Sequence, residues 1–228
     1  MSQQQHQQQH QHQAQRRINF PRECEQNLNK VIAVYQELSE LYQVMACHFM
    51  QAEVADRDFE MLLWRRSDKL QVGVAKLIRF MNKRGGRVQF QDIPQPTALQ
   101  WKDVLEAHQC SLSWEKKLYQ TVAELIQVAQ KQQDPETIDY CQKKILPKQS
   151  AVIKTVGDNI QTFQKMSEKQ EVSLTEFLWQ KHELEPVVIK ETLKLMQKTP
   201  YVYPRYIKKS DQEPTNPRVI LPTSSRKL

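Results

Sequence analysis

Apolar side chains recur at steps of three and four residues over long stretches of the chain. Between residues 22 and 50 they form one continuous stripe, which consists of Val31, Val34, Tyr35, Leu38, Leu41, Tyr42, Met45 and Phe49. The same spacing returns in residues 58–83, which contain no proline. This period is that of an amphipathic helix, and each helix would be about 25 residues, or about 40 Å, long. Long amphipathic helices of matched length are typical of a bundle.

Two further long helices are predicted in the second half of the chain. One spans residues 101–132, and the other runs to residue 166 from Asp134 and Pro135. Asp is a favourable N-cap and Pro suits the first helical position. Pro147 falls inside this fourth helix, where a missing N–H is expected to bend it.

The second and third helices are joined by a segment of a different kind. Two of the four glycines stand together at Gly85 and Gly86, which is typical of a tight turn that needs backbone freedom. Pro94 and Pro96 then favour an extended path up to residue 100. Such a crossover is long enough to run the length of a bundle, so the third helix need not simply double back.

The pattern divides the chain into three regions. Residues 1–21 begin with a Gln/His tract and are predicted to be a disordered tail. The tract's histidines are weak candidates for holding a transition metal, against the simpler interpretation of a disordered repeat. Residues 22–185 form the helical bundle, which includes a short fifth helix in residues 173–184. Residues 186–228 are a basic, proline-containing extension that we expect to be mostly flexible.

The positive charge of the chain is distributed unevenly along the sequence. The formal net charge is +7, but residues 23–185 carry 21 basic and 23 acidic residues. The predicted bundle is therefore close to neutral, and the basic excess lies in the tails.

The four cysteines have no C-x-x-C spacing, which favours reduced thiols in a cytoplasmic or nuclear protein. No apolar run approaches the roughly 20 residues that cross a bilayer, so we expect no membrane partner. The first residues lack an apolar signal core, so secretion is not expected.

Three polar residues fall on the stripes that should face the core. Glu115 lies on the apolar stripe of the third helix, Gln149 on that of the fourth and Tyr42 on that of the first. A carboxylate removed from water is costly unless something stabilises it. Glu115 is therefore either a metal ligand or, more simply, a protonated or hydrogen-bonded core residue that Gln149 or the Tyr42 hydroxyl satisfies.

At this point the sequence resembles a known family. The segments that carry the resemblance are Asn82–Ile93 with Pro96, Ser113–Lys116, Val156–Asn159 and Leu174–His182. They are similar, in order, to the junction after the second helix and to the third, fourth and fifth helices of animal ferritins. The resemblance covers about residues 24–185. It implies an all-α, ferritin-like four-helix bundle with a long crossover and a short fifth helix, and a heavy-chain-like subunit for intracellular iron storage.

Heavy ferritin subunits hold a di-iron ferroxidase centre, and the resemblance places its ligands on this sequence. Three of the four ligand positions are lost, at Tyr35, Leu70 and Gly73, and Glu115 is retained. The supporting positions Tyr42 and Gln149 are also retained. One carboxylate cannot offset the charge of two iron ions, so binding of iron in the bundle and ferroxidase activity are both doubtful.

The resemblance also locates two other iron-related surfaces. The acidic patch that faces the storage cavity is replaced by Lys69, Val72 and Ala75. Of the acidic pair at the three-fold entry channel, Asp139 matches and Gln142 does not. The channel is therefore expected to attract cations less strongly.

Three functions remain open from the sequence. The first is a ferritin subunit without ferroxidase activity, which acts structurally in a shell of up to twenty-four copies, by self-assembly or with other ferritin subunits. The second is a ferritin fold reused for interaction or nucleic-acid binding through the basic tail, where Tyr201, Tyr203 and Tyr206 are interleaved with Lys and Arg. The third, an active ferroxidase, has the least support.

Overall fold

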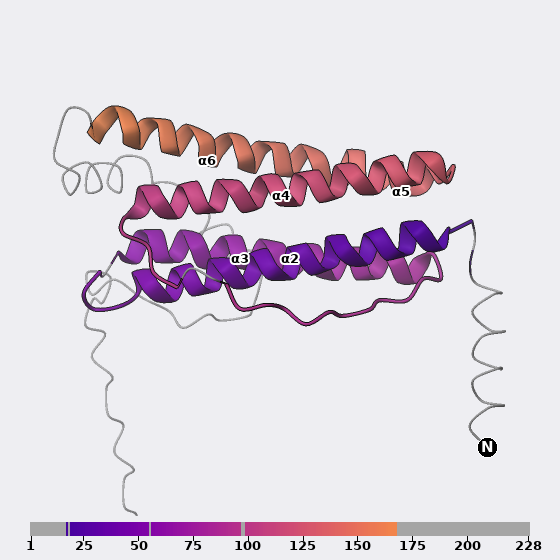
Figure 1. Ribbon diagram of the computed structural model, residues 1–228, viewed down its shortest axis with the longest axis horizontal. Helices are drawn as coiled ribbons and strands as arrows, with labels where there is room; N and C mark the ends of the chain where they lie inside the picture. Colours follow the sequence, from indigo (N-terminus) through magenta and orange to yellow (C-terminus); the bar gives the residue numbers. More distant parts are fainter. Residues whose placement is uncertain (1–16, 18, 55, 97–98, 168–228) are drawn as a thin grey trace, which may run out of the picture. The chain divides into compact units, whose positions relative to one another are not determined.

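The computed structural model describes residues 17, 19–54, 56–96 and 99–167, which all fall within one compact unit (Figure 1). The elements are α2 (Arg22–Phe49), α3 (Arg57–Lys83), α4 (Val104–Lys131), α5 (Pro135–Tyr140), a π-helical segment (Cys141–Ile145) and α6 (Leu146–Ser167). Every regular element in these ranges is a helix, which confirms the all-α prediction. No helix among them is apolar enough over its length to span a membrane.

An aspartate begins each of three helices. Asp56, Asp103 and Asp134 accept a hydrogen bond from the backbone N–H three residues later, at the starts of α3, α4 and α5. Such N-caps satisfy one of the donors that have no partner inside the helix. Helix α4 therefore begins three residues later than the sequence predicts. Trp101 instead lies buried before the helix, and its carbonyl oxygen is 2.9 Å from His48 Nε2.

The helices pack as a four-helix bundle in which α2 lies against α3 and α4 lies against α6 (Figure 1). Helix α2 also contacts α4, so that one core joins the two pairs. The inward stripe of α2 predicted from the sequence is nearly all buried, and Leu38, Leu41, Met45 and Phe49 are each at most 2% exposed. The hydrophobic period therefore selects the correct face of this helix.

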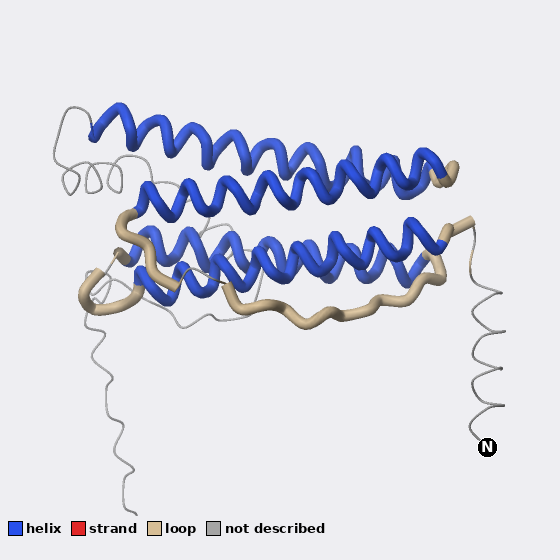
Figure 2. Tube along the Cα trace, viewed as in Figure 1, coloured by secondary structure: helices blue, strands red, loops and turns tan. Residues whose placement is uncertain are grey.

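The connection from α3 to α4 runs alongside the first helix pair without regular structure (Figure 2). It leaves α3 through a turn in which Gly85 has φ 76°, a left-handed conformation that suits glycine. The amide of buried Asn29 then holds the segment, because it donates to the Arg87 carbonyl (3.1 Å) and accepts from the Gln89 N–H (2.9 Å). The predicted long crossover is confirmed.

The predicted fourth helix is irregular close to Pro147, where the sequence predicts a bend. Residues 141–145 form a π-helix, and the Leu146 N–H donates to the Cys141 carbonyl five residues earlier. Pro147 lies two residues after this segment and has no N–H to donate to the Lys143 carbonyl, its partner in an α-helix. The π-helical segment, a wider turn just before the proline, thus accommodates the missing hydrogen bond.

Several predictions lie outside the described residues. These are the fifth helix, the disordered tail at residues 1–16 and the basic extension at residues 186–228, together with the tail's tyrosines. The division into three regions stays a prediction.

Candidate functional site

Glu115 on α4 is fully buried at the centre of the bundle. The Tyr42 hydroxyl donates to its Oε1 at 2.7 Å, and the Gln149 amide donates to both its carbonyl oxygen (3.0 Å) and its Oε2. The three inward polar residues predicted from three separate helices are therefore in direct contact.

A fourth member of this cluster, Arg66 on α3, was not predicted. Its Nε donates to Glu115 Oε1 and its Nη2 donates to Oε2, each at 2.7 Å. The Nη2 atom also lies 3.4 Å from Gln149 Oε1. Two parallel N–H donors on one carboxylate form the strongest common ion-pair geometry in proteins. We call Tyr42, Arg66, Glu115 and Gln149 the Glu115 cluster.

The electrostatics of the cluster follow from its burial. Burial opposes the charge of Arg66, but its hydrogen bonds to Glu115 and the carboxylate charge outweigh that effect and raise the pKa of Arg66. Burial and then the charge of Glu115 raise the pKa of Tyr42 well above its usual value. The cluster therefore holds one permanent cation, and Tyr42 remains a hydrogen-bond donor at all ordinary pH values.

The positions that the family resemblance assigns to lost ligands are filled by packing. Leu70 is a fully buried core residue. The ring of Tyr35 lies so close to Gly73 that a Cβ there would be 2.6 Å from Tyr35 Cε1. Burial raises the pKa of Tyr35 to about 12, so this residue is a neutral phenol. An aromatic ring thus occupies the space beside α3 that a side chain at position 73 would need.

These residues do not fit a pair of iron ions. A di-iron site needs several carboxylates to bridge the metals and offset their charge. Here Glu115 supplies the one carboxylate of the cluster, and both of its oxygens already contact the Arg66 guanidinium. Within the part of the chain that the structure describes, no three His, Cys, Asp or Glu residues are grouped as metal ligands.

The residues at the positions of the ferritin cavity patch and entry channel are exposed. Lys69, Val72 and Ala75 all lie on the solvent side of α3. Asp139 forms an ion pair with Lys143 at 2.5 Å. Gln142, three residues after Asp139, is also exposed. The neighbouring lysine partly offsets the negative charge that Asp139 keeps at this position.

Arg66 was missed because an arginine in a polar run is normally assigned to the surface. The signal was its register, since position 66 precedes the buried residues Leu70 and Leu77 by four and eleven residues. Those spacings place it on the inner flank of α3. A buried carboxylate on a facing helix then needs a cation within reach, which Arg66 supplies.

A four-helix bundle with one long crossover is the arrangement of the ferritin-like class of proteins. A model of the ferritin-like domain matches residues 25–166. The chain is 34% identical over 171 residues to "Ferritin, middle subunit" of Salmo salar, which covers 75% of this chain and 97% of that protein. It is 32% identical over 171 residues to "Ferritin, lower subunit" of Aquarana catesbeiana, which covers 75% of this chain and 98% of that protein.

The chain therefore belongs to the ferritin family, a family of iron-storage proteins. The family resemblance inferred from the sequence is confirmed. The narrower expectation of a heavy-chain-like subunit stays a prediction.

Proposed function

We propose that this chain is a structural ferritin subunit, which contributes walls and storage volume to an iron-holding shell but does not oxidise iron itself. The observation that carries the proposal is the two-point contact between Arg66 and Glu115. A guanidinium with a full positive charge supports the buried carboxylate that would otherwise attract iron.

The physical argument is one of charge. An Fe²⁺ ion entering the cluster has to displace or lie beside Arg66, whose like charge is poorly screened where water is scarce. Tyr35, Leu70 and Gly73 provide no anionic ligand in return. In place of a metal, Arg66 offsets the Glu115 charge, while Tyr42 and Gln149 satisfy its remaining lone pairs. The cluster then serves to join the helices α2, α3, α4 and α6.

Stopped-flow spectroscopy of aerobic Fe(II) oxidation tests the absence of ferroxidase activity. We expect the purified chain to oxidise Fe(II) no faster than buffer does. A rapid transient diferric-peroxo absorbance in the unaltered chain contradicts the proposal.

A designed reversal makes the same test sharper. One variant restores the three lost ligands through Tyr35→Glu, Leu70→Glu and Gly73→His, and a second adds Arg66→Gln. If the Arg66 charge excludes iron, only the second variant gains a fast phase of oxidation. Equal activity in the two variants removes Arg66 from the explanation.

We infer that the partners are copies of this chain or other ferritin subunits, in the cytoplasm or the nucleus. This inference is supported by the alignments, because both ferritin subunits named above align with this chain over nearly their whole length. Size-exclusion chromatography with light scattering, on the chain alone and co-expressed with a heavy ferritin subunit, measures the assembly. A mass near twenty-four subunits supports the proposal, whereas a monomer in both preparations contradicts it.

A further inference from the structure

A cavity of about 270 Å³ lies where the start of α2 meets the turn that follows α3. Its walls include Arg17, Arg22 and Arg87, together with Glu25, Asn29 and Gln89. None of these residues belongs to the Glu115 cluster. The cavity has room for several water molecules at about 30 Å³ each, and therefore for a small polyatomic ion.

The charges of the cavity do not cancel. Glu25 is the one acidic residue among its lining residues, and it is already engaged on both oxygens. Its Oε2 lies 2.7 Å from Arg17 Nη2, and its Oε1 accepts the Arg87 backbone N–H at 2.6 Å. The exposed guanidinium groups of Arg22 and Arg87 have no ion-pair partner among the described residues. Two arginines without an ion-pair partner among the described residues therefore line the same cavity.

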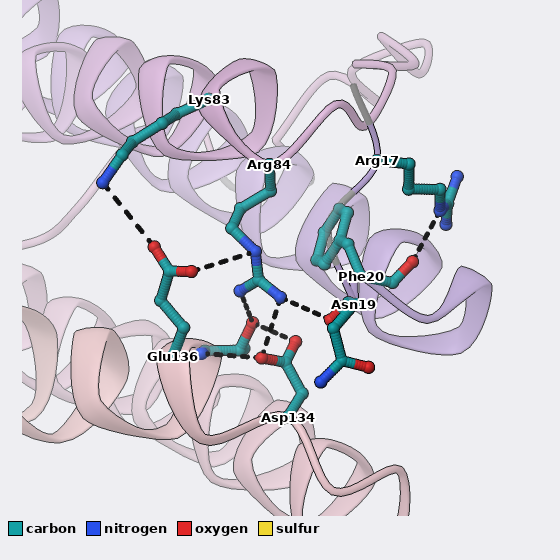
Figure 3. Close-up of polar contacts among 8 residues, drawn as sticks. Arg17, Asn19, Phe20, Lys83, Arg84, Asp134 and Glu136 are labelled. Atoms are coloured by element: carbon teal, nitrogen blue, oxygen red, sulfur yellow. Dashed lines mark hydrogen bonds and ion pairs between the residues drawn. The ribbon is translucent and has the colours of Figure 1, made fainter. Parts of the chain in front are cut away.

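Other arginines at this end of the bundle have structural roles, which makes the contrast clear. Arg84 is buried and bonded to Asp134 at 3.0 Å and to the Asn19 carbonyl at 2.6 Å (Figure 3). Arg17 Nε donates to the Phe20 carbonyl at 2.6 Å. Within the described residues, the side chains of Arg22 and Arg87 have no comparable contact.

The wall that carries Arg87 is fixed before any ligand arrives. The Asn29 amide pairs with both Arg87 and Gln89, and Glu25 holds the Arg87 N–H. The preceding turn is tightly packed, since a Cβ at Gly86 would lie 2.6 Å from Phe20 Cε1. A preorganised wall lowers the entropy cost of binding.

From these observations we propose that the cavity binds a phosphoryl anion, either free phosphate or the terminal phosphate of a small molecule. A phosphoryl group carries about −1.5 to −2 charges at pH 7, which matches the two unpaired guanidinium groups. Each guanidinium presents a planar fork of donors that suits phosphate oxygens. Gln26 and Gln89 also line the cavity, and a glutamine amide is a neutral hydrogen-bond donor.

Isothermal titration calorimetry of the full-length chain at low ionic strength tests the proposal. The probes are inorganic phosphate, pyrophosphate and ATP, which separate a free ion from a terminal phosphate. The pocket variant is Arg22→Gln/Arg87→Gln. The matched control, Arg79→Gln/Lys116→Gln, removes the same charge from exposed residues outside the cavity. All four positions are exposed, so circular dichroism and thermal melting should show unchanged folding.

We expect at least one probe to bind the unaltered chain. Its affinity for the pocket variant should be at least about ten-fold lower, since losing even one charge-assisted hydrogen bond has an effect of that order. The control should change affinity less than about three-fold, through general screening alone. Equal weakening in the two variants shows that net charge is responsible and overturns the proposal. Retained affinity in the pocket variant would mean that the anion binds elsewhere on this basic chain, which overturns the proposal. A failure of all three probes to bind the unaltered chain overturns it as well.

Discussion

The Arg66 guanidinium and the Glu115 carboxylate form two parallel hydrogen bonds of 2.7 Å inside the bundle. Glu115 is fully buried and the Arg66 side chain is 18% exposed, so the arginine approaches the carboxylate from the edge of the core. Water reaches only one side of the pair and screens it weakly. The stability of the bundle should therefore depend on this contact more than on any surface ion pair.

Replacing Arg66 with Met should lower the free energy of unfolding by about 3 kcal/mol, because Glu115 is left buried without its cation. Urea denaturation followed by circular dichroism measures the change. Lys154→Met is the control, since it removes an exposed pair with Asp158 and should cost about 0.5 kcal/mol or less. A similar small cost for both variants contradicts the role assigned to Arg66.

The contact between Tyr35 and Gly73 predicts opposite outcomes for the same substitution on two helices. Gly73→Ala places a Cβ 2.6 Å from the Tyr35 ring and should destabilise the protein by about 1 kcal/mol, because overpacking outweighs the gain in helix propensity. Gly157→Ala meets nothing within 4 Å and should stabilise by about 0.5 kcal/mol or more.

Thermal unfolding checks both expected changes in stability. The proteins to compare are the two alanine variants and a protein that combines Gly73→Ala with Tyr35→Leu. In the Tyr35→Leu background the Gly73→Ala penalty should disappear. If it persists, then the ring is not its cause.

The sequence predicts these features unequally, for physical reasons. Glu115, Tyr42 and Gln149 are identified because each lies in register with apolar neighbours on a long helix. Arg66 is not identified in this way, because it lies at the flank of the apolar stripe of α3. A long side chain can start at such a flank and still reach the core.

The π-helical segment is another feature that the hydrophobic period does not reveal. The segment spans only one turn, and the buried residues Cys141, Ile145 and Gln149 recur at steps of four across it, as they would in an α-helix. The anion cavity depends on contacts between residues about 60 positions apart, such as Asn29 with Arg87 and Gln89, and no local pattern reports these.

The four cysteines should differ sharply in reactivity. Cys47 is exposed, Cys110 is half-buried, and Cys24 and Cys141 are buried. Burial, and then the negative charge of Asp134, raise the pKa of Cys24 to about 11 and that of Cys141 to about 12. Burial also raises the pKa of Cys110. Since the thiolate is the reactive form, one thiol should react quickly with Ellman's reagent near neutral pH.

Cys47→Ser should abolish this fast phase, and Cys110→Ser should leave it unchanged. In denaturant all four thiols of the unaltered chain should react. Two or more fast thiols in the native protein would show that the bundle opens more readily than its packing implies.

His108 predicts how the stability depends on pH. It is buried beside Phe59, its Nδ1 lies 2.8 Å from the Val104 carbonyl, and its Nε2 lies 3.2 Å from the Asn159 amide nitrogen. Nδ1 therefore donates and Nε2 accepts, which is the pattern of a neutral imidazole. Burial lowers the pKa of His108 from 6.5 to about 4, although the bond to Val104 partly opposes the shift.

Because the unfolded chain takes up this proton first, the contribution of His108 to stability is fully present above pH 6.5 and is lost as the pH falls towards 4. The loss should amount to about 3 kcal/mol over that range, at 1.36 kcal/mol for each pKa unit. Urea unfolding at a series of pH values, for the unaltered chain and for His108→Gln, isolates this group, because all other titrations are common to both. The difference in unfolding free energy between the two proteins should stay constant above pH 7 and shrink on acidification. A difference that is independent of pH down to 4.5 would mean that His108 titrates normally and that the core around it is open to water.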